Sequence, residues 1–506
     1  MEIIKFSEDS LASALTNDYT SKEIIKSKNQ FNYFKDYLGP KGIDAKTIFI
    51  ENDYISKDFL LGYTSYYAYC FENYPKVCKR LHFFKNEFDD NLFSNEILKH
   101  EKDEDFWDNY LGFIVVKPIP ITVIGFSVLK TYHNNELRNF WGVREYDIHI
   151  FGTEIKIKSL AFQEQDSVIA ACATTAIWSM LNKASLDYHT TLKTPSEITK
   201  DADNVSPDGS RLFPNKGLSI LQICQSIVNS GLVSEVKRGD YFVDKKIGNV
   251  ISAEYLKKIL NAYSPIGIPL ILVVKVPNGV EYGWHALAVS GYKQKAPELK
   301  NPTNTISWYS DDIDRLYAHD DQWGPFARSK FINEYEIKTH WTKNDPQNRG
   351  TLVQNIVVPV YPKIRISYEN IEALVLGIDI MLTIFFTDKI VTDLVWDIKI
   401  DYSEVFKNQL KNSKLIDEIK LGKLSKGLPK YVWIARCFIA GQTVIEIIFD
   451  ATGVSNAMLC TDVICYLHEK EKNTLKDFLN NNKEKFRPLI NHHDRSNYYE
   501  FIVDSL

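Results

Sequence analysis

The chain has 506 residues, of which 44% are hydrophobic, 13% aromatic and 25% charged, and its net charge is −5. The near balance of 60 basic and 65 acidic side chains excludes the strongly basic class of nucleic-acid-binding proteins, and the aromatic content excludes extensive disorder. A chain of this length is expected to fold into about three domains.

The seven cysteines are odd in number and scattered along the chain, which argues against a disulfide framework. The N-terminal sequence lacks a basic segment followed by a sustained apolar run, so no signal peptide is expected. The longest apolar stretch, 371–386, contains two acidic residues and is too short to span a bilayer. We therefore expect a cytoplasmic protein with reduced thiols and no membrane span.

The first predicted domain, residues 1–110, is a mixed α/β region rich in Tyr, Phe, Lys and Asn. A helix is predicted over 58–70. The acidic, amide-rich stretch 86–109 is predicted to be a solvated surface or connection.

The second predicted domain, residues 111–362, begins with the strand Leu111–Val116, a β-branched run that ends before two prolines. Further strands are predicted at 121–128 and 147–157. Hydrophobic residues at helical spacing then predict helices at 172–181, 218–228 and 253–260. Four strands of one sheet follow, at 270–274, 285–292, 316–319 and 352–360. Because these helices precede the sheet instead of alternating with its strands, the predicted fold class is α+β.

The third predicted domain, residues 363–506, also has an α+β pattern. Strands are predicted at 431–439 and 443–449, and a Lys- and Asn-rich helix is predicted at 469–485. No motif in this region indicates its role.

Cys172 stands at the start of the first central helix. Unpaired backbone N–H groups and the positive end of the helix dipole favour the thiolate form of a cysteine at this position. Upstream, Gln163 or Gln165 can supply an amide donor toward an oxyanion, with the backbone N–H of Cys172 as a second donor. Taken alone, however, a cysteine at a helix start is more often a small core residue.

His285 opens a predicted strand, and Asp320 ends the following one. A histidine at a strand end can face a nucleophile on a neighbouring helix, and a carboxylate can hold its imidazole in one tautomer. Asp321 and His319 are expected to point away, since side chains alternate along a strand. The alternative is a hydrogen-bonded core histidine followed by a turn-capping aspartate.

Three segments in this order resemble papain-like cysteine peptidases, closest to the bacterial branch that includes the bacteriocin-processing peptidases. They are the glutamine-to-cysteine segment 163–181, the histidine segment 284–292 and the aspartate segment 316–321. The resemblance covers about residues 160–330. It implies a helix that carries the cysteine and packs on an antiparallel sheet.

By this resemblance, Cys172 is the nucleophile, His285 the base, Asp320 the acid and Gln165 the oxyanion donor of a peptidase. It implies a thioester intermediate, no cofactor and a protein or peptide substrate. Transglutaminase, deamidase and acyltransferase chemistry use the same thiol and base. The flanking domains suggest a regulatory protein partner.

The sequence departs from the family pattern in three places. Gln165 lies seven residues before Cys172, with Asp166 at the sixth position, and Ala173 replaces the usual glycine. The 35-residue separation of His285 from Asp320 implies an insertion at 293–314. The choices between Gln163 and Gln165, and between Asp320 and Asp321, stay open.

Two other functions compete with the enzyme. Cys460, Cys465 and His468, with His492-His493-Asp494 downstream, contain zinc-ligand residue types, although the spacing is wider than zinc sites prefer. The first competing function is thus a metal site, and the second is a catalytically silent papain-like binding module. Against it, all three polar positions carry chemically competent side chains.

Overall fold

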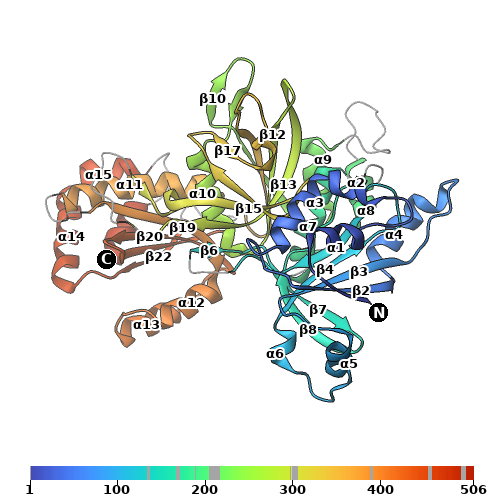
Figure 1. Ribbon diagram of the computed structural model, residues 1–506. Coiled ribbons are helices and arrows are strands. Elements are labelled where there is room, and N and C mark those ends of the chain that lie inside the picture. Colours follow the sequence, from blue (N-terminus) through green and yellow to red (C-terminus); the bar gives the residue numbers. More distant parts are fainter. Residues whose placement is uncertain are drawn as a thin grey trace. The chain divides into compact units, whose positions relative to one another are not determined.

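The computed structural model describes residues 2–133, 137–166, 171–187, 190–203, 217–296, 298, 306–387, 390, 392–453, 459–491 and 497–506. Within these ranges the protein is a mixed α+β structure with several mostly antiparallel sheets (Figure 1). The predicted α+β class is confirmed at this level. In the described part of the chain, no helix has the length and apolar character needed to cross a bilayer.

The chain divides into two compact units, and each is built from three segments. Unit 1 comprises Met1–Ser252, Gly267–Lys293 and Asp314–Pro359, and unit 2 comprises Ala253–Ile266, Gln294–Ile313 and Val360–Leu506. The division into domains 1–110, 111–362 and 363–506 stays a prediction, because a compact unit need not be a unit of independent folding.

Unit 1 begins with an antiparallel five-stranded sheet in the order of the sequence. Its strands are β1 (Glu2–Lys5), β2 (Thr47–Tyr54), β3 (Cys78–Phe84), β4 (Tyr110–Val116) and β5 (Ile124–Leu129). The helices among them are α1 (Glu8–Ala14), α2 (Lys22–Ser27), α3 (Asn29–Leu38), α4 (Lys57–Ser65), α5 (Asp90–Leu98) and α6 (Glu104–Trp107). All seven residues of β4 are buried, which accounts for its continuous hydrophobic sequence.

The stretch 86–109 forms the helices α5 and α6, so of the two predicted alternatives it is a solvated surface and not a connection. Most of its polar residues face solvent, whereas Phe93, Phe106 and Trp107 are buried. Their rings gather around Phe84 of β3, with centroid distances of 5.9–6.1 Å. The packing of these three apolar side chains therefore stabilises helices in a segment whose overall composition is typical of a loop.

Two predicted strands have different bounds. The strand predicted at 121–128 begins only at Ile124, since Ile121 has φ +62°, a left-handed conformation that a strand cannot contain. The strand predicted at 147–157 is a hairpin of β7 (Arg144–Ile150) and β8 (Thr153–Ser159), which turns at Phe151-Gly152. The predicted 58–70 helix ends at Ser65, and a 3-10 turn, η1 (Tyr67–Tyr69), follows.

The central part of unit 1 packs helices against a closed sheet. Its helices are α7 (Cys172–Asp187), α8 (Pro195–Asp203) and α9 (Ile220–Asn229). The buried face predicted for α7 is confirmed, and its members are Ala173, Ala176, Ile177, Met180 and Leu181. Thr174, Thr175 and Ser179 are buried as well, so α7 is enclosed almost all round.

Six strands pair in a ring, which makes the sheet barrel-like. They are β12 (Leu270–Asn278), β13 (Glu281–Gln294), β15 (Ile313–Asp320), β16 (Gly324–Phe331), β17 (Glu336–Lys338) and β18 (Thr351–Val360), and β18 pairs back with β12. β6 (Arg138–Asn139) and β9 (Val233–Arg238) extend this sheet, and β10 (Tyr241–Asp244) and β11 (Gly248–Val250) form a separate pair. The prediction that four central strands share one sheet is confirmed.

Unit 2 has its own five-stranded sheet. In spatial order the strands are β14 (Ser307–Trp308), β19 (Leu394–Tyr402), β20 (Tyr431–Ile439), β21 (Gln442–Asp450) and β22 (Cys460–Cys465). Its helices are α10 (Ala253–Tyr263), α11 (Tyr368–Phe386), α12 (Ser403–Lys411), α13 (Asp417–Leu424), α14 (Glu469–Asn481), α15 (Lys483–Ile490) and α16 (Tyr498–Ser505). The predicted helix at 469–485 is thus two helices, α14 and α15.

Candidate active site

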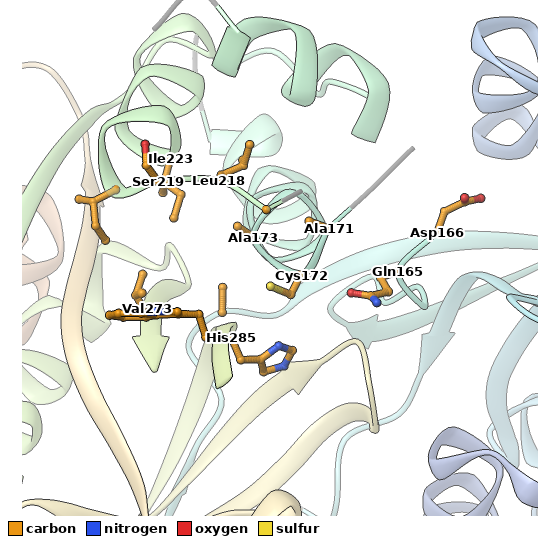
Figure 2. A pocket seen from close by; sticks show the side chains of 14 residues that line it. Gln165, Asp166, Ala171, Cys172, Ala173, Leu218, Ser219, Ile223, Val273 and His285 are labelled. Carbon is orange, nitrogen blue, oxygen red and sulfur yellow. The ribbon is translucent and has the colours of Figure 1, made fainter. Parts of the chain in front are cut away.

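A cavity of about 630 Å³ in unit 1 brings the sequence-predicted residues Cys172, His285 and Gln165 together. Figure 2 shows the three side chains on one side of the cavity, with Gln165 extended toward Cys172. The rest of the lining is mainly apolar and comes from α7, α9 and the sheet: Ala171, Ala173, Leu218, Ile220, Ile223, Val273, Trp284 and Ala286.

Cys172 is the first residue of α7 and is partly exposed to solvent. The enclosed helix behind it fixes the backbone, so the thiol sits at the boundary between packed core and cavity. Its thiol is close enough to the imidazole of His285 to help raise the pKa of that ring. The preceding residues of the predicted motif, 167–170, lie outside the described residues.

His285 lies within β13, five residues into the strand, and pairs with Val274 of β12. The prediction that it opens a strand is therefore wrong: β13 extends further toward its N-terminus because Glu281–Trp284 also pair with β12. The imidazole is only 5% exposed. Burial lowers the pKa of His285, but the charge and hydrogen bond of Asp320, with Cys172 and Asp321, raise it well above its ordinary value.

Asp320, the last residue of β15, is the acid that holds His285. Its Oδ1 accepts a hydrogen bond from His285 Nε2 at 2.9 Å and one from the backbone N–H of Gln322 at 3.1 Å. Its Oδ2 accepts from Trp341 Nε1 at 2.9 Å. Because Asp320 occupies Nε2, the other ring nitrogen, Nδ1, is left for the thiol.

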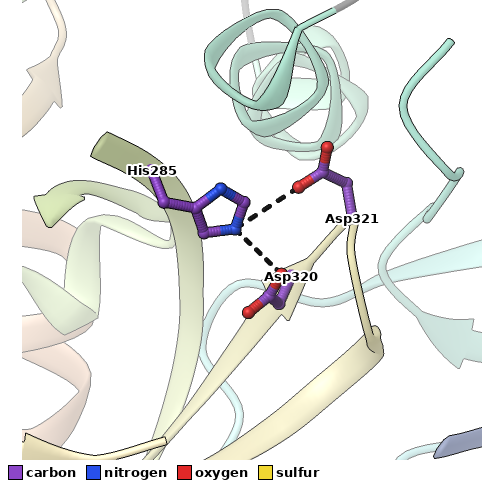
Figure 3. Close-up of side chains that lie close together, drawn as sticks. All are labelled: His285, Asp320 and Asp321. Carbon is purple, nitrogen blue, oxygen red and sulfur yellow. Dashed lines mark hydrogen bonds and ion pairs between the residues drawn. The ribbon is translucent and has the colours of Figure 1, made fainter. Parts of the chain in front are cut away.

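Asp321 also approaches His285, contrary to the alternation expected along a strand. Figure 3 shows both carboxylates on the same side of the imidazole, and Asp321 Oδ1 is 3.5 Å from Nε2. The reason is that β15 ends at Asp320 after a register shift against β16, so Asp321 belongs to the turn. Both Asp321 oxygens are buried without a hydrogen-bond partner, and burial raises the pKa of this carboxyl to about 7.

His319 points away from the pair formed by His285 and Asp320, as predicted. Its Nε2 donates to the carbonyl oxygen of Leu160 at 3.0 Å, and its Nδ1 accepts the backbone N–H of Phe326 at 3.2 Å. This pairing fits the neutral ring, and burial lowers the pKa of His319 to about 4. His319 is therefore a structural histidine that joins two segments of unit 1.

Gln165 and Gln163 take different positions. Gln165 lines the cavity beside Cys172, whereas Gln163 lines a separate small cavity and its buried Nε2 has no hydrogen-bond partner. The geometry thus favours Gln165 as the side chain that can reach a carbonyl oxygen near the thiol.

Helix α3 of the N-terminal region supports the turn that carries the two aspartates. Gln30 Nε2 donates to the carbonyl oxygen of Asp321 at 3.1 Å, and the hydroxyl of Tyr33 donates to that of Pro325. Gly324 permits this approach, since a Cβ there would lie 2.1 Å from the Tyr33 ring. Residues from the start of the chain therefore help to hold the acid.

Trp341 is a site residue that sequence reasoning missed. Besides its bond to Asp320, its ring packs edge-on against His285 with 5.2 Å between ring centroids. It lies in η4 (His340–Thr342), within a mostly polar stretch. A single tryptophan among polar residues is a weak indication of a functional contact. The sequence could not show that its partner is Asp320, because this contact depends on how β16 and β17 return the chain to the site.

The ligand types of a metal site occur at one place among the described residues, His285, Asp320 and Asp321. There, Nε2 already donates a hydrogen bond to Asp320, which is the arrangement of a triad. Within the described part of the chain, Cys460, Cys465 and His468 do not belong to a cluster of metal-ligand groups. Cys460 is buried on β22, and burial raises the pKa of its thiol to about 12. His492, His493 and Asp494 lie outside the described residues.

No model of a known protein family matches this chain, and no curated protein matches it either.

Proposed function

We propose that this protein is a papain-like cysteine hydrolase, a peptidase that uses Cys172, His285 and Asp320 through a thioester intermediate. The observation that supports it most is that Cys172 and His285 line one large cavity, while Asp320 holds the His285 imidazole through a 2.9 Å hydrogen bond. The three residues come from α7, β13 and β15 and are up to 148 positions apart in sequence (320 − 172).

The proposed reaction begins when His285 Nδ1 takes the proton of Cys172. The thiolate forms a bond to the carbonyl carbon of the substrate, and the carbonyl oxygen becomes an oxyanion near the Gln165 amide and the Cys172 backbone N–H. The intermediate collapses as the carbon–nitrogen bond breaks, and His285 protonates the leaving amine. Water then gives a proton to His285 and displaces the thiolate from the thioester.

Asp320 contributes by stabilising the charged imidazole in the first step. Its two other donors, Gln322 N–H and Trp341 Nε1, keep the carboxylate oriented and hydrogen-bonded while buried. The positive charge of the imidazolium is then balanced by the negative charge of the thiolate on one side and of this carboxylate on the other.

The cavity favours a peptide substrate. Apolar side chains of α9 and the sheet face the thiol, and Trp284 at its edge is 64% exposed, available to contact a bound chain. We further propose a reducing, cytoplasmic compartment, since the mechanism needs a free thiol and all seven cysteines are unpaired.

The first test compares the full chain with its Cys172→Ala variant on a proteome-derived peptide library, with cleavage products identified by mass spectrometry. We expect cleavage by the wild type alone, with both proteins equally stable to heat. Equal cleavage by both would remove Cys172 from the mechanism. Adding a primary amine separates hydrolysis from acyl transfer, because attack of the amine on the thioester gives an amide product in place of part of the carboxylic acid.

A second measurement separates an enzyme from a silent binding module. Iodoacetamide labelling at neutral pH is followed at each cysteine, and Cys224 serves as an internal standard, because it is also partly exposed and burial raises the pKa of its thiol. We expect Cys172 to react at least tenfold faster than Cys224. Equal rates, together with no cleavage of any peptide, would favour the binding module.

A further inference from the structure

Gln165 lies between two buried carboxylates, Glu164 and Asp166, which are only 4% and 6% exposed. A buried carboxylate is unfavourable unless partners satisfy it. Each of the two carboxylates has partners among the first 124 residues of the chain. The position of Gln165 therefore depends on a region that carries none of the proposed catalytic residues.

Glu164 is fixed by a buried ion pair and by the backbone of β5. Its carboxylate contacts Lys28 Nζ, and the Lys28 side chain is only 10% exposed. The other oxygen accepts the N–H of Ile124 at 3.2 Å, while the Glu164 N–H donates to the Ile124 carbonyl at 3.1 Å. Two contacts thus attach this residue to the N-terminal sheet, and one attaches it to the residue that joins α2 to α3.

Asp166 is fixed from the other side by Tyr67. The Tyr67 hydroxyl donates to Asp166 Oδ2 at 2.6 Å, and Lys117 Nζ lies 3.9 Å from the same oxygen. Tyr67 is itself buried in η1, where its ring packs against Phe59 and Tyr74. Figure 2 shows that Asp166 points away from Cys172 while Gln165 points toward it.

We propose that Tyr67 is a positioning residue of the active site, which acts through Asp166 to hold the Gln165 amide where the substrate oxyanion forms. This inference rests on the proposed function. Tyr67 touches no reacting atom: its hydroxyl restrains the peptide unit after Gln165, and the Glu164 contacts restrain the one before it. A side chain held on both flanks needs no reorganisation when the oxyanion appears. The N-terminal region is then part of the catalytic apparatus.

The expected effect follows from the role of Gln165. Loss of one oxyanion donor typically lowers kcat about 10²–10³-fold, and Tyr67→Phe can lower it by no more than Gln165→Ala does. We expect a loss of about tenfold or more in kcat for Tyr67→Phe, with KM changed less than about threefold, since the apolar cavity is untouched. Alkylation of Cys172 by iodoacetamide should stay within about twofold of wild type, since alkylation forms no oxyanion.

A double-mutant cycle on a peptide that the wild type cleaves tests the coupling. If Tyr67 acts through Gln165, then Tyr67→Phe should cause no further loss in a Gln165→Ala background. The matched control is Tyr63→Phe, a buried tyrosine of the preceding helix α4, which should leave kcat unchanged. Asp166→Asn retains an acceptor for the Tyr67 hydroxyl and should keep most of the activity that Asp166→Ala loses.

Full activity of Tyr67→Phe would overturn the proposal, as would losses that multiply independently with Gln165→Ala. A parallel fall in Cys172 alkylation would also overturn it, since Tyr67 would then support the whole fold. If Tyr67→Phe does not fold, the comparison of Asp166→Asn with Asp166→Ala tests the proposal instead. Equal activity of these two variants would overturn the proposal. Failure of the proposed function is distinct, because wild type and Cys172→Ala would then be equally inactive.

Discussion

Replacing Asp320 with asparagine tests how much the buried acid contributes to the thiol. The carboxylate accepts three hydrogen bonds, from His285 Nε2, the Gln322 N–H and Trp341 Nε1. An asparagine has one acceptor oxygen and one donor NH₂ group. In either amide orientation, one of the two side-chain donors, His285 or Trp341, then faces another donor.

The magnitude can be worked from these contacts. A hydrogen bond to a charged group contributes about 1.5–3 kcal/mol, which corresponds to roughly 10- to 150-fold in a rate, since about 1.4 kcal/mol is tenfold. Asp320 is also the main influence that raises the pKa of His285 against the lowering by burial. Without the charge, burial dominates, so the imidazole resists protonation and the thiol keeps its proton.

The assay is the rate of Cys172 alkylation by iodoacetamide at pH 6, followed by mass spectrometry. We expect Asp320→Asn to react about 10- to 150-fold more slowly than wild type. Asp314→Asn is the matched control, because Asp314 lies on the same strand β15 and pairs only with its neighbour Arg315 among the contacts described, and it should react like wild type. An Asp320→Asn rate within twofold of wild type would refute the view that this carboxylate sets the charge of His285.

Two further predictions concern the groups around this acid. Because the pKa of Asp321 rises from 3.8 to about 7 in the folded protein, the folded state holds this proton more tightly than the unfolded state, and stability is lost as pH rises from about 4 to 7. The free energy of unfolding of Asp321→Asn should therefore rise relative to that of wild type across this window, by up to roughly 4 kcal/mol. A difference in free energy of unfolding between the two proteins that is the same at pH 4 and at pH 8 would contradict this expectation. Trp341→Phe keeps the ring against His285 but removes the donor to Asp320 Oδ2. The loss of one hydrogen bond to a charged group, about 1.5 kcal/mol, should lower kcat/KM by about tenfold, and a value within twofold of wild type would be inconsistent with this assignment.

Local patterns in the sequence were enough for features that depend on neighbouring residues. The spacing of Ala173, Ile177 and Leu181 predicted the buried face of α7, because a helix brings every third or fourth side chain to one side. Short apolar runs likewise predicted four of the six strands of the barrel, β12, β13, β15 and β18, whereas β16 and β17 were not predicted. The order of Cys172, His285 and Asp320 marked the residues that the structure brings together.

Features that depend on composition alone were less predictable. The stretch 86–109 has the acidic and amide residues of a loop, yet Phe93, Phe106 and Trp107 find a shared partner in Phe84. The hairpin of β7 and β8 was likewise predicted as one strand, because its two arms have the same alternating pattern and only Phe151-Gly152 separates them.

By itself, the sequence determined the three amphipathic helices and four of the strands in the centre of the chain, and which three side chains to consider together. Only the tertiary structure decided that Asp321 turns toward His285, that Trp341 binds Asp320, and that Tyr67 and Lys28 hold the segment around Gln165. The physical reason is that the hydrophobic periodicity of a helix or strand depends on residues a few positions apart. These contacts, by contrast, join residues up to 136 positions apart (164 − 28). Their partners are selected by how the sheet closes and where each turn interrupts the alternation of side chains.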